Sequence, residues 1–204
     1  MNPRELFTLT LKGLLAWLVL SGLVWYFGEW LAKGLFPLLK AVIMMMTSEI
    51  SPSLNLIPST QALPDDTIEL SAWVLHPLYI NASVGIPPGT ELKESAHLLH
   101  ALVPLVIEGS ILLVWPVHRW QQRLVLMVFG LLTAVLVIMA TLPAQLLGIL
   151  EISFQEVAMS GNQPRPVPWF VDWMVFCEMG GRWLLAIAAA GWCIQLQRGL
   201  LKRW

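Results

Sequence analysis

Four stretches of this chain are apolar over a length that suits a lipid bilayer, and no other feature constrains the fold as strongly. A bilayer-spanning helix needs about 20 predominantly apolar residues. The predicted spans cover residues 14–31, 98–117, 124–142 and 173–194. Because lipid offers no partner to open backbone groups and four segments are too few for a closed barrel, each span must be a helix. The sequence therefore predicts an all-α membrane protein with four transmembrane helices.

The composition agrees with a location in the membrane. Hydrophobic residues make up 57% of the chain and charged residues only 12%, whereas soluble domains carry about 25% charged residues. The net charge of −1 provides no basic field, so we expect no nucleic-acid partner. The first partner that the sequence predicts is the lipid bilayer itself.

Basic residues predict how the spans are oriented. Seven of the twelve lie at the two ends of the chain or in the 116–123 connection, namely Arg4, Lys12, Arg119, Arg123, Arg198, Lys202 and Arg203. The segment 47–96 contains six acidic residues and one basic residue. By the positive-inside rule, we expect both termini and the 116–123 connection to lie in the cytoplasm.

Two longer segments should then lie on the outer side. In 47–96, apolar and polar residues alternate from Thr67, which predicts a strand and hence a small β-containing extracytoplasmic cap. The start of this segment is rich in proline and serine over 51–64, a composition typical of turns. The second segment, 143–172, begins with a predicted amphipathic helix over 146–159 and continues as a proline-rich strap.

Two further proline-containing sites predict breaks in regular structure. Pro37 follows the first span and should bend or restart the helix, because proline lacks an amide hydrogen. The stretch 87–89, Pro-Pro-Gly, should form a turn shortly before the second span.

Ionisable side chains inside the spans are the first candidates for a functional site. A charge at the centre of a bilayer costs about 2.5–3.5 kcal/mol on insertion scales and is rarely left unpaired. Glu108 lies in the second predicted span, and Glu178 and Arg182 lie one helical turn apart in the fourth. We predict an intramembrane polar network in which Arg182 bridges the two glutamates. Such a network either stabilises the bundle or a partner interface, or it serves as a proton path, a substrate site or a catalytic acid.

The glycines beside this arginine favour the first of these interpretations. Gly180 and Gly181 directly precede Arg182. Small residues let a second helix approach closely in a membrane. We therefore predict that this part of the fourth span is a helix-packing surface.

A second group of residues could bind a metal ion. Glu94, His97 and His100 follow at intervals of three residues, which places them on one face if the stretch is helical. His76, on the predicted strand, could add another nitrogen ligand. The alternative is that the histidines form hydrogen bonds at the level of the lipid headgroups. No Cys-x-x-Cys or His-Glu-x-x-His pattern accompanies them, so we predict neither a metal nor another cofactor.

The sequence contains no familiar catalytic motif. It lacks the Gly-x-Ser-x-Gly, phosphate-loop and dinucleotide-binding patterns. A cysteine nucleophile is conceivable, but Cys177 and Cys193 have no histidine close to them in the sequence. We therefore assign no catalytic residue.

Four stretches carry a resemblance to a known family, namely residues 25–26, 68–79, 142–148 and 180–185. In these stretches and in the order of its elements, the chain resembles the small membrane proteins associated with exosortase H. That bacterial system is linked to the processing and sorting of exported proteins with C-terminal tags. The resemblance implies an accessory role beside a membrane protease, without catalytic residues in this chain.

Together these observations favour a non-enzymatic accessory or structural subunit of a bacterial inner-membrane complex, with another membrane protein as its partner. Two alternatives stay open. The chain could be an intramembrane or membrane-surface hydrolase that uses Glu108, Glu178 and the histidines. It could also be a small transporter subunit, which would form a pore only as an oligomer because four spans are few.

Overall fold

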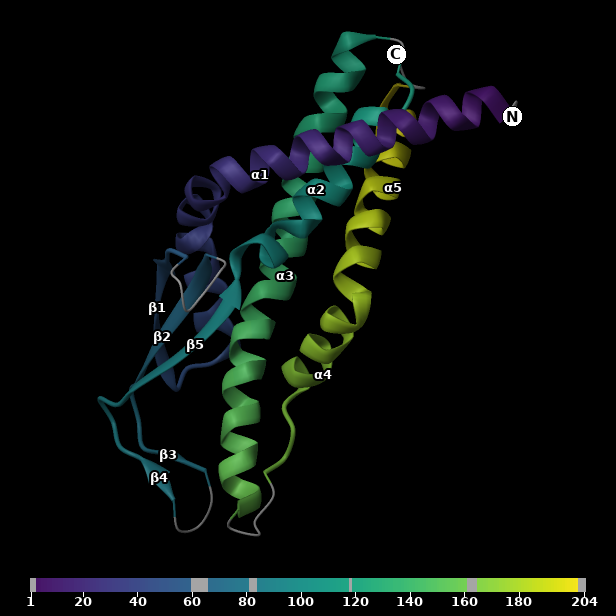
Figure 1. The fold of residues 1–204 in the computed structure, drawn as a ribbon. Coiled ribbons are helices and arrows are strands. Elements are labelled where there is room, and N and C mark those ends of the chain that lie inside the picture. Colours follow the sequence, from purple (N-terminus) through teal and green to yellow (C-terminus); the bar gives the residue numbers. More distant parts are fainter. Residues whose placement is uncertain (1–2, 60–65, 81–83, 118, 161–164, 202–204) are drawn as a thin grey trace. The chain divides into compact units, whose positions relative to one another are not determined.

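The computed structural model describes residues 3–59, 66–80, 84–117, 119–160 and 165–201 (Figure 1). Asp65, Lys202 and Arg203, which contribute to the charge pattern above, lie outside the described residues. Most of the chain is helical, and the strands of a small sheet follow the first helix and precede the second in the sequence. The elements are α1 (Pro3–Met46), β1 (Ile50–Ile57), β2 (Thr67–Val74), β3 (Leu78–Tyr79), β4 (Gly85–Ile86), β5 (Glu91–His97), α2 (Leu98–Val114), α3 (Trp120–Ser160), α4 (Trp169–Phe176), η1 (Cys177–Gly181) and α5 (Arg182–Leu201).

Three helical segments of the described chain are long and apolar enough to cross a membrane. They are Phe7–Met46, Trp120–Ser160 and Trp169–Gly199, with 40, 41 and 31 residues. Their length and apolar character indicate a membrane protein. The second predicted span corresponds to α2, which has 17 residues and falls short of the usual length of about 20.

Helices α1 and α3 extend beyond the first and third predicted spans. Helix α1 continues through Pro37 without a restart, and α3 continues through Pro143. The amphipathic helix predicted over 146–159 is therefore the C-terminal part of α3 and not a separate helix. A proline inside a helix removes one backbone hydrogen bond, and neighbouring groups in a membrane protein can satisfy the freed carbonyl.

The fourth predicted span is likewise not one regular helix. Helix α4 ends at Phe176, the π-helical segment η1 follows, and α5 begins at Arg182. Within η1, Gly180 has a φ of 106° and marks a kink between the two helices. Since residues with a Cβ rarely adopt such a φ, the glycine determines the position of the kink between α4 and α5.

The described chain forms two compact units, and each is built from separate stretches of the sequence. Unit 1 comprises Met1–Gly28, Leu102–Ile138 and Gly180–Trp204. Unit 2 comprises Glu29–Ala101 and Met139–Met179. The first part of α1, most of α2, the first part of α3 and α5 thus belong to unit 1, and the sheet belongs to unit 2.

Unit 1 is a helical bundle with an apolar core shared by α2, α3 and α5. Its buried members are Leu112, Leu126, Ala190, Cys193 and Ile194. Helix α3 approaches α2 so closely at Gly130 that an added Cβ would overlap the side chain of Leu112. An alanine at this position would therefore require the Leu112 side chain to move within the packed bundle.

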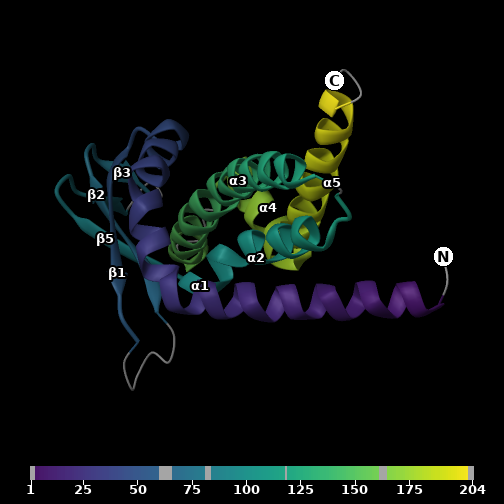
Figure 2. The same cartoon turned by 90° about the horizontal axis from the view of Figure 1, so that it is seen from above.

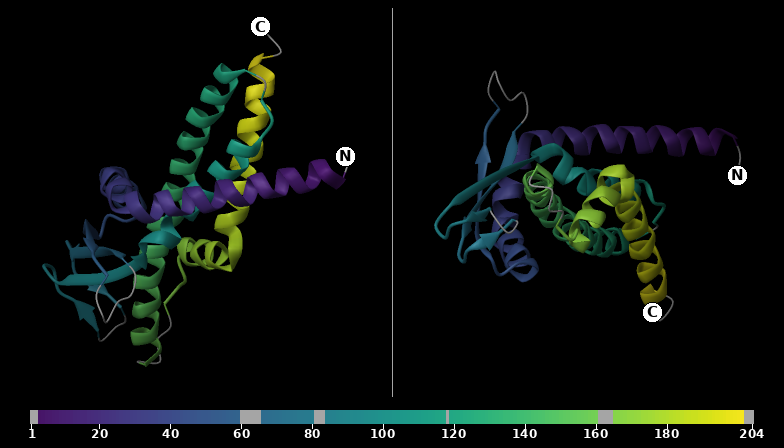
Figure 3. Two further views of the ribbon diagram at one scale, coloured as in Figure 1. Left: turned by 45° about the horizontal axis from the view of Figure 1, so that its top comes forward. Right: turned by 90° about the horizontal axis from the view of Figure 1, so that it is seen from below.

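Unit 2 contains a three-stranded antiparallel sheet in the order β1–β2–β5. The C-terminal part of α1 lies beside one face of this sheet, as Figures 2 and 3 show. Leu39 and Ile43 of this part of α1 are buried. Elsewhere in unit 2, α3 and α4 pack closely at Gly148, where an added Cβ would lie 2.5 Å from the Met174 sulfur.

The sheet confirms one prediction and corrects another. The strand predicted from Thr67 is β2, and its alternate apolar residues Ile68 and Leu70 are buried. Of the passage predicted to consist of turns, residues 60–64 lie outside the described residues, and residues 51–57 instead belong to β1. Strand β1 pairs with β2 so that Pro52 lies opposite Ala72. A strand at the edge of a sheet tolerates proline, because its outward amide needs no partner within the sheet.

Candidate functional site

Glu108 is the centre of a polar cluster in unit 1. Its side chain lies in α2 and has no exposed surface. The Thr133 hydroxyl of α3 donates a hydrogen bond to Glu108 Oε1, and the Cys193 sulfur of α5 lies 3.7 Å from the same oxygen. The Thr133 Oγ1 and Cys193 Sγ atoms are 3.2 Å apart. This Glu108 cluster, formed by Glu108, Thr133 and Cys193, thus connects three helices through polar contacts.

The hydroxyl of Thr133 has several acceptors within reach. Besides the Glu108 carboxyl, it lies 2.9 Å from the Phe129 carbonyl and 3.2 Å from the Gly130 carbonyl of its own helix. A hydroxyl has a single proton to donate. Donation to Glu108 therefore replaces a bond within α3 by a bond between helices, which is how a threonine contributes to helix association in a membrane.

The other carboxyl oxygen of Glu108 is less well satisfied. Glu108 Oε2 is buried and has no hydrogen-bond partner among the described residues. A polar atom without a partner in an apolar surrounding is costly, which makes the contacts to Oε1 more important for stability. Because the carboxyl has no exposed surface, a substrate cannot touch it unless the helices separate.

The other two residues of the predicted intramembrane network belong to different units. Arg182 is the first residue of α5, in unit 1, and is fully buried. Glu178 lies in η1, in unit 2, and its side chain is 42% exposed. The Glu178 Oε2 atom lies 3.4 Å from Nε2 of His100, also in unit 2. The bridge by Arg182 between Glu178 and Glu108 stays a prediction.

The two glycines beside Arg182 have at least one backbone role. Nothing lies within 4 Å of a Cβ built on Gly180, whereas its φ of 106° is one that other residues rarely adopt. The geometry thus favours glycine at position 180 because of the kink in η1. The helix-packing role of Gly180 and Gly181 stays a prediction.

The residues considered as metal ligands are divided among a strand, a helix and a connection. Glu94 and His97 belong to strand β5, His100 belongs to α2, and His76 lies between β2 and β3. The helical spacing that would align Glu94 with His97 therefore does not exist, and Glu94 instead accepts a hydrogen bond of 3.1 Å from the Ser153 hydroxyl of α3. In the part of the chain that the structure describes, no three His, Cys, Asp or Glu side chains gather as a metal ion requires.

Unit 2 contains an ion pair that the sequence analysis missed. The Arg165 guanidinium contacts the Glu151 carboxylate of α3, with 3.2 Å between Nε and Oε1. The same guanidinium donates a 2.9 Å hydrogen bond to the Tyr79 carbonyl of β3 and lies 5.6 Å from the centre of the Phe154 ring. Arg165 thus connects the strap to α3 and to β3. One signal was available, because Arg165 is the only basic residue in 143–172.

Comparisons with known proteins add no family assignment. No family model, curated protein or solved structure matches the chain. The class that its own structure defines is a helical membrane protein with a small antiparallel sheet.

Proposed function

We propose that the chain is a non-enzymatic accessory subunit of a bacterial inner-membrane complex and works beside an exosortase-type protein-sorting system. The observation that carries this proposal is the Glu108 cluster. Its carboxyl, hydroxyl and thiol groups are buried and contact one another across three helices. A catalytic site needs polar groups that a substrate can reach. Buried polar groups that connect the helices of this chain instead support a non-catalytic role.

The proposed topology has four spans, with α2 as the shortest and both termini in the cytoplasm. A helix of 17 residues is about 25 Å long, against a hydrocarbon core of about 30 Å. Local thinning of the bilayer accommodates such a difference at modest cost. The basic residues at both termini and in the 116–123 connection support this orientation. In it, the sheet lies outside the membrane as a small cap.

Reporter fusions test this topology. Alkaline phosphatase is active only outside the cytoplasm, so we expect it to be inactive at either terminus. Inserted at Gly89, in the turn before β5, it should be active. An active fusion at the C-terminus together with an inactive one at the N-terminus would mean that α2 does not span the membrane.

Photo-crosslinking tests the accessory role. Trp25 and Leu184 are exposed, apolar and part of the stretches that resemble the exosortase-associated family. An aromatic photo-crosslinker at either position in growing cells should form an adduct with one distinct membrane protein. The same crosslinker at the buried Leu112 is the control and should form none. Adducts with lipid alone at both positions would refute the proposal.

One observation favours a second candidate function, a membrane-surface hydrolase. His100 and Glu178 form an imidazole–carboxylate pair at 3.4 Å, and both side chains are about 40% exposed. Such a pair can act as a general base when a substrate reaches it. A hydrolytic activity that persists through purification and disappears in Glu178→Gln would establish this alternative. If the wild type and Glu178→Gln both assemble fully with the partner and neither has hydrolytic activity, the accessory role is supported.

A further inference from the structure

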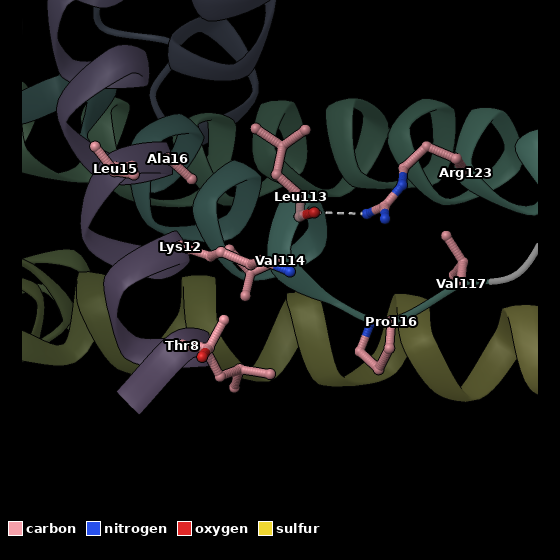
Figure 4. A pocket seen from close by; sticks show the side chains of 10 residues that line it. Thr8, Lys12, Leu15, Ala16, Leu113, Val114, Pro116, Val117 and Arg123 are labelled. Carbon is pink, nitrogen blue, oxygen red and sulfur yellow. Dashed lines mark hydrogen bonds between the residues drawn. The ribbon is translucent and has the colours of Figure 1, made fainter. Parts of the chain in front are cut away.

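A cavity of about 710 Å³ lies in unit 1 beside the end of α2. Thr8 and Lys12 of α1 line one side of it, and Arg123 of α3 lines another. Figure 4 shows the Lys12 and Arg123 side chains extending from their helices toward the end of α2. Two cations from separate helices thus face one space.

Neither cation is neutralised within the described chain. No acidic residue lines the cavity, and the described residues provide no ion pair for Lys12 or Arg123. The Arg123 Nη1 atom donates to the carbonyls of Leu112 and Leu113, at 2.8 Å and 2.7 Å. These bonds hold the guanidinium at the C-terminal end of α2, where a cation is favourable. They leave the Nε and Nη2 donors without an acceptor in the described part of the chain.

A second cavity, of about 740 Å³, adjoins the first. The two share Leu9, Val114 and Pro116 among their lining residues. The second cavity is almost wholly apolar and is lined by the three indole rings of Trp17, Trp115 and Trp183. The hydroxyl of Ser110, also in its lining, already donates to the Val106 carbonyl of its own helix.

We propose that these adjoining cavities together bind one anionic phospholipid. Lys12 and Arg123 bind its phosphate group, because an ammonium and a planar guanidinium are the side chains that suit phosphate oxygens. The tryptophan-lined cavity holds an acyl chain. A free phosphate ion would use the first cavity only, so the apolar continuation favours a lipid. Basic pockets between membrane helices bind anionic headgroups in this way, and the site does not depend on the proposed partner.

Binding of phosphatidylglycerol to the delipidated full-length protein tests this proposal. Native mass spectrometry gives the affinity of the protein for phosphatidylglycerol and for the zwitterionic phosphatidylcholine. We expect phosphatidylglycerol to bind more tightly. Lys12→Gln should weaken its binding about fivefold, because each basic side chain near an anionic lipid contributes about 1 kcal/mol. Lys12 lies on an exposed helix face, so this variant should fold.

Two further variants separate the site from general surface charge. Arg119 is exposed, lies in the same basic connection and does not line the cavity, so Arg119→Gln should change the affinity less than twofold. Arg123→Gln should weaken binding as Lys12→Gln does. Arg123→Gln also removes the bonds to α2. Circular dichroism therefore serves as the folding control, and the spectrum of this variant should match that of the wild type. Equal effects of Lys12→Gln and Arg119→Gln would overturn the proposal.

The acyl chain has its own test. Phosphatidylglycerol with brominated acyl chains should quench tryptophan fluorescence in the wild type and less in Trp17→Leu, which removes one ring from the cavity. Excess inorganic phosphate should not displace the lipid. Displacement by phosphate, or equal affinity for phosphatidylcholine, would refute the binding of an anionic phospholipid at this site.

Discussion

The contact between Thr133 and Glu108 makes the clearest prediction about stability. Thr133→Val replaces the hydroxyl by a methyl group of the same shape, so it removes the bond to Glu108 Oε1 without creating a cavity. The Glu108 carboxyl then keeps only the Cys193 thiol, a weak donor at 3.7 Å. Its other oxygen already lacks a partner among the described residues. We expect the free energy of unfolding to fall.

Two considerations set the size of this change. Leaving a buried polar group without its partner costs about 1–3 kcal/mol. Hydrogen bonds between membrane helices average only about 0.6 kcal/mol and reach about 1.7, because the unfolded state in a membrane also finds partners. The Glu108 carboxyl has no exposed surface, which places it in the upper part of that range. The expected loss is therefore about 1–2 kcal/mol.

Reversible unfolding in mixed micelles, followed by circular dichroism, measures the change. Ser110→Ala is the matched control, because the Ser110 hydroxyl is buried on the same helix as Glu108 but donates only to the Val106 carbonyl of that helix. It should cost less than about 0.5 kcal/mol. In a Glu108→Met background, Thr133→Val should also cost little, since its acceptor is gone. Equal losses for Thr133→Val and Ser110→Ala would refute the reasoning.

Three further substitutions test the packing and the ion pair by the same unfolding measurement. Gly130→Ala should destabilise unit 1 by about 1–3 kcal/mol because the new methyl overlaps Leu112, and adding Leu112→Ala should recover part of that loss. Gly180→Ala should cost about 1–2 kcal/mol because of its positive φ, whereas Gly191→Ala, in open space within α5, should be neutral or stabilising. Arg165→Lys should cost about 1.5 kcal/mol, since an ammonium cannot reproduce the bonds of the guanidinium to both the Tyr79 carbonyl and the carboxylate of α3. Wild-type stability in Arg165→Lys would show that the guanidinium geometry is unimportant.

The helices were the most predictable part of the fold, but their ends were not. Apolar length identifies the segments that become α1 and α3, because the bilayer thickness sets that length. The sequence predicts a bend or a restart at Pro37 and an end of the third span at residue 142, yet neither α1 nor α3 ends at its proline. A membrane helix tolerates proline when neighbouring groups satisfy the freed carbonyl. Those neighbours come from the tertiary structure and cannot be read from local sequence.

The strands show a similar limit. The alternation from Thr67 predicts β2 correctly, because β2 is the central strand and buries Ile68, Leu70 and Ala72. Strand β1 contains Pro52, which reads as a turn residue. Only its place at the edge of the sheet makes the proline acceptable, and that place follows from long-range pairing.

In the candidate site, Glu108 could be found from the sequence and its partners could not. A carboxylate within an apolar stretch is unusual enough to mark a polar cluster. Thr133 and Cys193 are common in membrane helices and lie 25 and 85 positions away from Glu108. Their contacts depend on how α2, α3 and α5 pack, which a single sequence does not specify.

The most direct test of the accessory role is the stoichiometry of the protein in its own membranes. Extraction in a mild detergent, followed by native mass spectrometry, gives the mass and composition of the assembly that contains this chain. The account predicts a fixed ratio with one larger membrane protein, and this assembly should persist in Glu178→Gln. A homogeneous species that contains this chain alone would contradict it.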